Sequence, residues 1–493
     1  MSEEKSSYRQ IFKATSIFGG VQVFNILISI IRSKVIAVLL GPMGMGIAGL
    51  LTSTIAIISS LTSFGLGVSS VKDIAAANES KNNIKLLKTS AILNKLVLYT
   101  GILGTIITLV LSPILSKITF DNYQYTWLFI FLSITLFFGQ LTLGKDAVLQ
   151  GTRQLKRLAY ANMLSSFISL IITLPLYFFY GIEGIVPSMI IISCTTLVVT
   201  QFFYRKLKLS LPSISNKETW MKGKSMLKMG FFLSLSGLII TICAYLVRIF
   251  ITHVGSLNDV GFYNAGFAII NSYVGIVFTA MATDYYPRLA GVINDKIKYI
   301  EVVNQQGNVA LLILGPIVTV FIVFINVTVI ILYSEEFLPI STMMKYSAIG
   351  IFFKAASWLL GFIVLAKGST KLFFFGELIA NLYMTLLNCV GFYYWGLDGL
   401  GYSFIIGYFI YLFQMIIVSR KAYGFYFESS FLNIFIIQIF IASIALFSTT
   451  FTNNIVLSYT LGITMIISTI AFSLFRINTI LNLKEFFFKF IKR

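Results

Sequence analysis

Residues 17–46, IFGGVQVFNILISIIRSKVIAVLLGPMGMG, decide the fold of this chain. The stretch is apolar over the length of about 20 residues that a helix needs to cross a bilayer. It nevertheless carries Arg32 and Lys34 inside its hydrophobic length, and it ends in a glycine-rich turn at 40–46. A cation near the middle of a membrane costs at least about 2.5 kcal/mol, and such a charge is retained where it faces protein, water or an anion. We therefore interpret the stretch as a membrane-spanning helix whose cations face an internal cavity.

The composition of the whole chain is that of a polytopic membrane protein. Its 493 residues are 57% hydrophobic and 11% charged, with a mean hydropathy of +0.89, whereas a soluble protein has about 25% charged residues. The apolar segments are continuous runs of roughly 20 residues, which indicate helices, and not the alternating runs of about 10 that indicate a β-barrel. The first run is too long for the core of a cleaved signal peptide, so we expect it to be the first span.

Fourteen such runs are separated by charged or Gly/Pro-containing breaks, and the breaks alternate in charge. Most of the 37 Lys and Arg residues lie in every second break, including both ends of the chain. Positively charged loops stay cytoplasmic, so the alternation predicts an even number of spans and cytoplasmic termini. The net charge of +19 is then a topology signal and not a nucleic-acid-binding surface. The predicted helices are 15–40, 44–66, 90–112, 124–144, 158–180, 184–204, 229–253, 260–282, 306–332, 341–366, 371–393, 398–419, 431–450 and 455–475.

Two sequence motifs recur in the second half of the chain. Residues 180–184, YGIEG, recur as WGLDG at 395–399, an offset of 215. The turn QGT at 150–152 recurs as KGS at 367–369, an offset of 217. Each half then contains six predicted helices, an even number, so both copies have the same orientation in the membrane. This predicts a parallel repeat about an axis along the membrane normal, as in one class of transporters.

The repeat predicts an all-α membrane protein of two six-helix lobes around a central cationic cavity, followed by two further helices. We expect a substrate to bind where the two lobes face each other. The predicted parts are an N-lobe at 1–204, a basic cytoplasmic linker at 205–228, a C-lobe at 229–419, and helices 13 and 14 with a basic cytoplasmic tail at 420–493.

Four cations inside apolar runs are candidates for binding that substrate. Arg32 and Lys34 are two residues apart, about 200° around a helix, so both cannot point into one cavity. Arg248 matches Arg32 in the repeat, and we expect the two to oppose each other. Lys354 lies too deep in its run to reach either surface easily. Such a group of cations attracts phosphate, which guanidinium grips with two hydrogen bonds. Two further cations lie near helix ends, where they can reach the interface: Lys95 and Lys345.

Two carboxylates near or inside the apolar runs are candidates for ion coupling. Glu377 lies one turn into its run, and Asp146 lies at the end of another. Either could carry a coupling proton or sodium ion. Alternatively they pair with Lys371 and Lys145, and we favour this pairing.

The sequence offers no motif for enzyme chemistry. It contains no G-x-x-x-x-G-K-[ST] loop for ATP, and no His/Cys/Asp cluster with metal-ligand spacing. The three cysteines are scattered through apolar runs and are most simply buried small hydrophobic residues: Cys194, Cys243 and Cys389. We therefore expect no cofactor and no metal site, apart from a coupling H⁺ or Na⁺.

At several positions the chain resembles the polysaccharide branch of the multidrug/oligosaccharidyl-lipid/polysaccharide exporter superfamily. The matching segments are KVIAVLLGPMGMG at 34–46, FKA at 353–355, LAK at 365–367 and GEL at 376–378, with PRL at 287–289. Within that branch the likeness is to O-antigen translocases and to lipid III flippases of enterobacterial common antigen. It covers predicted helices 1–12.

The resemblance implies a V-shaped, two-lobed fold with a cationic central cavity. It implies alternating access, driven by an ion gradient, that moves an undecaprenyl-diphosphate-linked oligosaccharide from the cytoplasmic to the periplasmic leaflet of the bacterial inner membrane. The expected partners are this lipid-linked oligosaccharide, the membrane lipids and other glycan-assembly membrane proteins. The resemblance implies a functional role for Lys34, Lys354, Lys367 and Glu377. The role predicted for Arg32 and Arg248 depends on the repeat alone.

Four other functions compete with this interpretation. A drug or organic-cation antiporter of the same fold would need acidic, aromatic cavity walls, but the deep charges here are mostly cations. A lipid II flippase for peptidoglycan would share the fourteen helices and the cationic cavity. A membrane enzyme such as an O-antigen polymerase normally needs a large periplasmic loop, and the longest outer loops here have about ten residues. A structural scaffold would gain nothing from buried cations.

Overall fold

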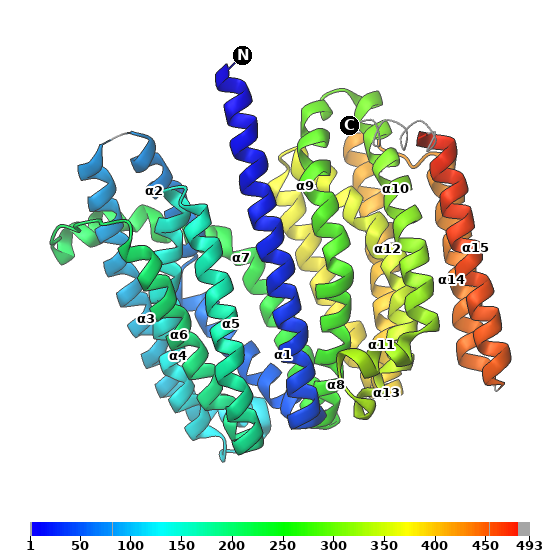
Figure 1. Ribbon diagram of the computed structural model, residues 1–493, viewed down its shortest axis with the longest axis horizontal. Helices are drawn as coiled ribbons and strands as arrows, with labels where there is room; N and C mark the ends of the chain where they lie inside the picture. Colours follow the sequence, from blue (N-terminus) through cyan, green and yellow to red (C-terminus); the bar gives the residue numbers. More distant parts are fainter. Residues whose placement is uncertain (1, 81, 453, 482–493) are drawn as a thin grey trace. The chain divides into compact units, whose positions relative to one another are not determined.

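The computed structural model describes residues 2–80, 82–452 and 454–481, and every regular element in these ranges is a helix (Figure 1). The basic tail beyond residue 481 and the side chains of the basic N-terminus lie outside the described residues. The elements are α1 (Ser2–Thr62), α2 (Leu66–Glu79), α3 (Asn83–Phe120), α4 (Thr126–Gly151), α5 (Leu155–Tyr180), η1 (Gly181–Gly184), α6 (Ile185–Arg205), α7 (Asn216–Val254), α8 (Leu257–Ala268), η2 (Ile269–Val274), α9 (Gly275–Val292), α10 (Lys296–Val323), α11 (Ile325–Leu332), η3 (Glu335–Phe337), α12 (Ile340–Ala366), α13 (Thr370–Tyr423), α14 (Ser429–Phe451) and α15 (Ile455–Leu481).

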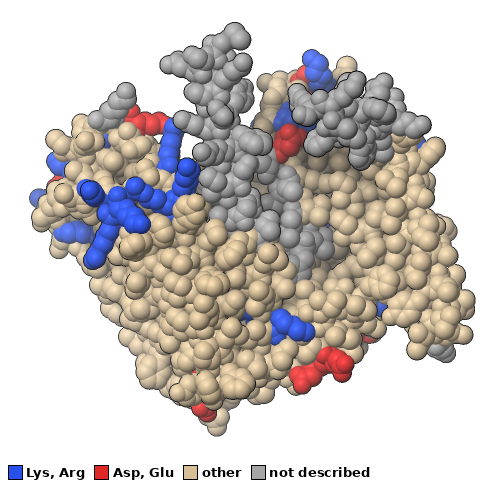
Figure 2. Space-filling model, in the orientation of Figure 1, with Lys and Arg blue, Asp and Glu red and all other residues tan. Residues whose placement is uncertain are grey.

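The predicted all-helical membrane fold is confirmed. Ten segments among the described residues are helical, long and apolar enough to cross a bilayer, and three of them each cover two of the predicted helices. The predicted helix 260–282 is divided among α8, η2 and α9. The structure is therefore consistent with fourteen spans, to which it adds α2 as a short helix in a basic break. Charged side chains on the face in Figure 2 gather toward the helix ends and leave a broad uncharged area between them.

Single glycines end one helix and begin the next at three places. Gly41 lies inside α1 with φ 65° and ψ −170°, and Gly396 lies inside α13 with φ 56° and ψ −137°. Gly181, after α5, has φ 54° and ψ −132°. Residues with a Cβ rarely adopt this backbone region, so each glycine is required where it stands. The conformations of Gly181 and Gly396 are nearly identical, as the repeated motif predicts.

The second glycine of that motif is required for a different reason. A Cβ on Gly184 would lie 2.5 Å from the Leu176 carbonyl oxygen, and a Cβ on Gly399 would lie 1.9 Å from the Gly391 carbonyl oxygen. In both copies the contacted carbonyl is eight residues earlier in the chain. The motif thus combines a left-handed turn with a close approach of the two adjoining helices.

The ends of α4 and α12 also repeat, with an offset that corrects the sequence alignment. Residues 148–154 and 363–369 form the same three backbone hydrogen bonds, 2.8–3.0 Å in the first copy and 2.9–3.2 Å in the second. They are Schellman motifs, in which the residue after the helix adopts a left-handed backbone conformation with positive φ. That residue is Arg153 (φ 57°) in one copy and Gly368 (φ 69°) in the other. The true offset is therefore 215 and not 217, because Gly368 corresponds to Arg153 and not to Gly151.

The chain divides by its contacts into two units, Met1–Gly261 (unit 1) and Phe262–Arg493 (unit 2). This division assigns α7 to unit 1, where it packs against α1, α2 and α3. A Cβ on Gly65 would lie 2.0 Å from the Gly230 carbonyl oxygen, so the backbones of the α1–α2 junction and α7 are in direct contact. The lobe boundary at 205–228 stays a prediction, because contacts report packing and not internal symmetry.

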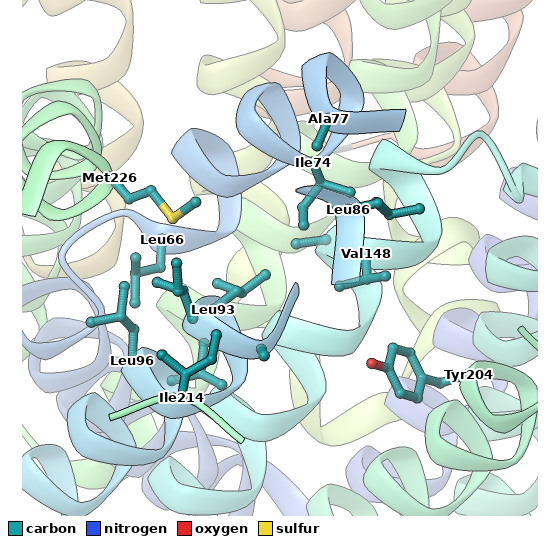
Figure 3. Packing of buried hydrophobic residues seen from close by; sticks show 14 residues of the cluster. Leu66, Ile74, Ala77, Leu86, Leu93, Leu96, Val148, Tyr204, Ile214 and Met226 are labelled. Atoms are coloured by element: carbon teal, nitrogen blue, oxygen red, sulfur yellow. The ribbon is translucent and has the colours of Figure 1, made fainter. Parts of the chain in front are cut away.

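The predicted linker at 205–228 is packed onto the core of unit 1. Ile214 and Met226 are each 4% exposed and belong to a cluster with Leu66, Leu93 and Val148, from α2, α3 and α4 (Figure 3). Since these two apolar side chains are buried, this segment is an integral part of unit 1.

The two helices beyond the predicted repeat are built into unit 2. Both α14 and α15 pack against α10. Inside this group Gln438 is fully buried, donating to Ser473 Oγ (3.0 Å) and accepting from Thr469 Oγ1 (2.6 Å). A buried amide that is bonded at both ends fixes the register of α14 on α15. Gly315 of α10 leaves space for this amide, since a Cβ there would lie 2.2 Å from Gln438 Oε1.

Candidate functional site

Three of the predicted cations lie in unit 1. Arg32 is half-buried in α1 beside Tyr177 of α5, and its Nε is enclosed without a hydrogen-bond partner among the described atoms. Lys34 is also half-buried in α1. Arg248 is half-buried in α7, and its Nη1 donates to the Ala244 carbonyl oxygen one turn earlier (2.9 Å). The predicted opposition of Arg32 and Arg248 stays a prediction.

Asp146, the predicted coupling carboxylate of unit 1, lines a pocket of about 380 Å³ between α2, α4 and α6. The favoured pairing with Lys145 is not formed, because Lys145 Nζ donates to the Leu141 carbonyl oxygen instead (3.2 Å). Asp146 Oδ1 is enclosed and has no hydrogen-bond partner in the described part of the chain. Adjacent residues in a helix point about 100° apart, which explains why Lys145 forms no close ion pair with Asp146, although its charge still attracts the carboxylate from a longer distance.

Lys354, the predicted cation of unit 2, lies among neutral partners. Its Nζ donates to Asn271 Oδ1 at 3.4 Å. It also lies 5.4 Å from the centre of the Tyr408 ring and 5.9 Å from that of Phe404. Aromatic faces attract a cation without cancelling its charge. The ion pairs found among the described residues do not include Lys354, so its positive charge remains available.

A pocket of about 130 Å³ adjoins Lys354 and is lined by the same three partners. Asn388 and Ser403 complete its polar lining, and Asn388 Oδ1 is buried without a partner among the described residues. Asn271 lies in η2, a single π-helical stretch, and such stretches are frequent at functional sites. Sequence reasoning missed Asn271 because nothing in its local pattern marks the change of helix type.

Glu377, the second predicted coupling carboxylate, is held by a tyrosine. The Tyr411 hydroxyl donates to Glu377 Oε1, and Gln414 Nε2 donates to the Gly376 carbonyl oxygen (3.0 Å). Glu377 therefore accepts a hydrogen bond from the neutral hydroxyl of Tyr411 in place of the favoured pairing with Lys371. This hydrogen bond joins the two parts of α13 on either side of Gly396.

A series of side-chain contacts through two tyrosines connects Lys354 with Glu377. The rings of Tyr408 and Tyr411 lie 6.4 Å apart, one beside Lys354 and the other bonded to Glu377. Phe404, Tyr408 and Tyr411 are spaced four and three residues apart, so they share one face of α13. This spacing was the available signal for the two tyrosines, which sequence reasoning missed.

The remaining lysines of the apolar runs bond to backbone carbonyls. Lys95 Nζ donates to the Ile214 carbonyl oxygen, and Lys345 Nζ donates to that of Thr449 (2.7 Å). Lys367, which the family resemblance singled out, donates to the Ile293 carbonyl oxygen (2.6 Å) at the end of α12. Each of these three lysines donates to a backbone carbonyl oxygen, whereas Lys354 donates to the side-chain amide of Asn271.

Comparison with known proteins identifies the family. The model of a family described as "Polysaccharide biosynthesis protein" matches residues 35–342, more than half of the chain. The chain belongs to this family. No curated protein matches the sequence significantly.

Solved structures with the same fold come from the MOP superfamily. The lipid II flippase MurJ, in an inward closed conformation, has a TM-score of 0.71 at 15% identity and covers 94% of this chain and 99% of its own. An inward-facing multidrug resistance MATE transporter has a TM-score of 0.68 at 16% identity, with coverages of 82% and 94%. A MOP transporter from Pyrococcus furiosus has a TM-score of 0.56 at 15% identity, with coverages of 83% and 95%. At 15–16% identity these likenesses concern the fold: this member of the polysaccharide biosynthesis family has the multi-pass helical fold of these membrane transporters.

Proposed function

We propose that this family member is a flippase for an undecaprenyl-diphosphate-linked oligosaccharide, such as an O-antigen repeat unit. It moves this lipid from the cytoplasmic to the periplasmic leaflet of the bacterial inner membrane, by alternating access driven by a gradient of H⁺ or Na⁺. Both termini lie in the cytoplasm. The membership of a polysaccharide biosynthesis family and the fold of a MOP flippase support the proposal.

The observation that carries the proposal is the environment of Lys354. A diphosphate group that crosses the hydrocarbon core needs a counter-charge, because an unpaired charge is costly there. Lys354 lies midway along a spanning helix, beside a pocket, with an amide and two aromatic rings as neighbours. These neighbours hold the ammonium group without neutralising it, so a phosphate oxygen can form a charge-assisted hydrogen bond to it. Arg32, Lys34 and Arg248 are the proposed cations of unit 1.

A lipid II flippase is the second candidate. It is favoured by the likeness to MurJ, which extends over 94% of this chain, whereas the MATE transporter covers 82%. A drug or cation antiporter fits less well, because an ammonium group held among neutral partners repels an organic cation.

The deciding experiment deletes the gene and analyses extracted lipids by mass spectrometry. We expect one undecaprenyl-diphosphate oligosaccharide of a surface glycan to accumulate, and its mass identifies the substrate. Accumulation of lipid II would favour the second candidate. Unchanged lipids with increased drug sensitivity would contradict both flippase functions.

A matched pair of variants on α12 tests the role of Lys354. Lys354→Gln should fail to clear the accumulated lipid, whereas Lys345→Gln should clear it normally. Lys345 is the control because it lies nine residues away on the same helix and bonds to a backbone carbonyl. Equal clearance by both variants would show that Lys354 does not bind the transported lipid.

A further inference from the structure

The pocket that contains Asp146 is lined by one face of α4 and one face of α6. Thr142, Asp146 and Gln150 are four residues apart and therefore lie above one another on α4. Ser193 and Thr196, three residues apart, face them from α6. The volume of about 380 Å³ compares with the roughly 30 Å³ that one water occupies. The pocket therefore has room for a small ligand together with several waters.

The hydroxyl groups of this lining present lone pairs and not protons. Thr142 donates to the Phe138 carbonyl oxygen (2.9 Å), Ser193 to that of Ile190 (2.8 Å) and Thr196 to that of Ile192 (2.8 Å). A hydroxyl group has one proton and two lone pairs. With the protons engaged inside the helices, the three oxygens can act only as acceptors or as ligands.

The carboxylate adds negative charge to this set of oxygens. Asp146 Oδ1 is enclosed and lacks a hydrogen-bond partner among the described residues. Lys145 is the adjacent cation; its ammonium group is bonded to the Leu141 carbonyl oxygen and forms no close ion pair with this carboxylate. Enclosing a carboxylate oxygen without a hydrogen-bond partner costs free energy, because the oxygen loses its contacts with water. The site therefore favours a positively charged ligand and disfavours an anionic one.

We propose that this pocket binds a monovalent metal cation, with the Asp146 carboxylate as its anionic ligand. The hydroxyl oxygens of Thr142, Ser193 and Thr196 supply neutral ligands, and waters complete the shell. Oxygen-only ligands suit a hard cation. One carboxylate balances a single positive charge, whereas a divalent ion would keep an excess positive charge at this site. Na⁺ fits these requirements.

The inference deepens the proposed function, because it identifies a site for a coupling ion, and it rests on that function only for the coupling. Cation binding itself is measured on purified protein without any transported lipid. Failure of the cation site and failure of the flippase function can therefore be told apart.

The test measures thermal unfolding of the full-length protein in detergent while NaCl replaces choline chloride at constant ionic strength. A ligand that binds only the folded state raises the melting temperature in a saturable manner. We expect such a rise for the unmodified protein and at least a tenfold weaker apparent affinity for Asp146→Asn. Glu183→Gln is the control, since it removes an exposed carboxylate of unit 1 outside the pocket and should keep the full response.

A second variant covers the case in which Asp146→Asn does not fold. Thr196→Val removes one neutral ligand and should weaken the apparent Na⁺ affinity several-fold. An unchanged Na⁺ response in either folded variant would overturn the inference. So would a response of the unmodified protein to pH but not to Na⁺, because the pocket would then hold a proton. If both variants lose Na⁺ binding but no lipid accumulates in the deletion strain, the cation site stands and the flippase function fails.

Discussion

Asp146 of unit 1 and Lys354 of unit 2 lie on equivalent helices, α4 and α12, but carry opposite charges. The matching ends of α4 and α12 align these helices with an offset of 215. Lys354 of α12 then corresponds to Gly139 of α4, and Asp146 of α4 corresponds to Gly361 of α12. Each charged residue therefore has a glycine as its counterpart. The ends of α4 and α12 have the same backbone hydrogen bonds, but the charged residues on these helices differ. Asp146 lies among the hydroxyl groups of its pocket, whereas Lys354 lies among aromatic rings.

The largest expected effect is the reversal of charge in unit 2. Lys354→Glu should abolish clearance of the lipid-linked intermediate, because a carboxylate repels diphosphate at the position where the ammonium group attracts it. Lys354→Arg should retain a measurable part of the activity, since guanidinium keeps the charge and can also bond phosphate. Complementation of the deletion strain, followed by lipid mass spectrometry, measures both. Comparable activity of the two variants would mean that packing and not charge matters at this position.

The two copies of the glycine motif should differ in their tolerance of a methyl group. Gly399→Ala should be more destabilising than Gly184→Ala, because the added Cβ would approach a carbonyl oxygen to 1.9 Å in one case and 2.5 Å in the other. Overpacking of this kind costs typically about 1–3 kcal/mol. Thermal unfolding in one detergent gives the order of the two variants. The reverse order would contradict the backbone contact at Gly391.

A lysine placed at the mouth of the unit 1 pocket should replace the proposed cation. Gln150→Lys puts an ammonium group four residues after Asp146, in the favourable order for a helical ion pair. We expect the melting temperature to become insensitive to Na⁺ and to rise slightly in Na⁺-free buffer. Gln150→Met, which has similar length and no charge, is the control and should keep the Na⁺ response. A Na⁺ response of equal size in both variants would argue against a site at Asp146.

The smallest effect concerns the left-handed residues after α4 and α12. Gly368→Ala should destabilise the protein by about 1 kcal/mol, since a left-handed residue with a Cβ costs about 1–2 kcal/mol. Arg153→Gly should stabilise it by a smaller amount, because it also removes the exposed ion pair with Glu79 (2.5 Å), worth about 0–1 kcal/mol. Melting temperatures of both variants provide the comparison. Equal shifts of the same sign would disprove the equivalence of these residues.

Sequence reasoning predicted the features that depend on local pattern. The continuous apolar runs predicted helices, since a bilayer leaves no other solution for their backbone groups. The YGIEG and WGLDG motifs predicted the equivalence of Gly181 and Gly396, which the backbone angles confirm. The alignment of QGT with KGS was wrong by two residues, because a left-handed Arg153 cannot be recognised from its residue type.

The partners of the charged side chains could not be predicted in this way. Glu377 was assigned to a lysine six residues away, yet its partner is Tyr411, 34 positions later in the chain. Asp146 was assigned to its neighbour, yet it faces α6 across a pocket. The burial of apolar residues in the predicted linker was missed as well. Ile214 lies in a basic segment whose composition predicts a linker, yet it is buried in the core of unit 1.

By itself the sequence determined that this protein crosses the membrane many times as helices, and it predicted two related halves with cations inside their apolar runs. Hydropathy, loop charge and motif recurrence are properties of the chain alone, so they could be read from it directly. The tertiary structure alone decided which charges are neutralised and which remain available. That outcome depends on the direction of each side chain and on the residues that distant helices bring beside it.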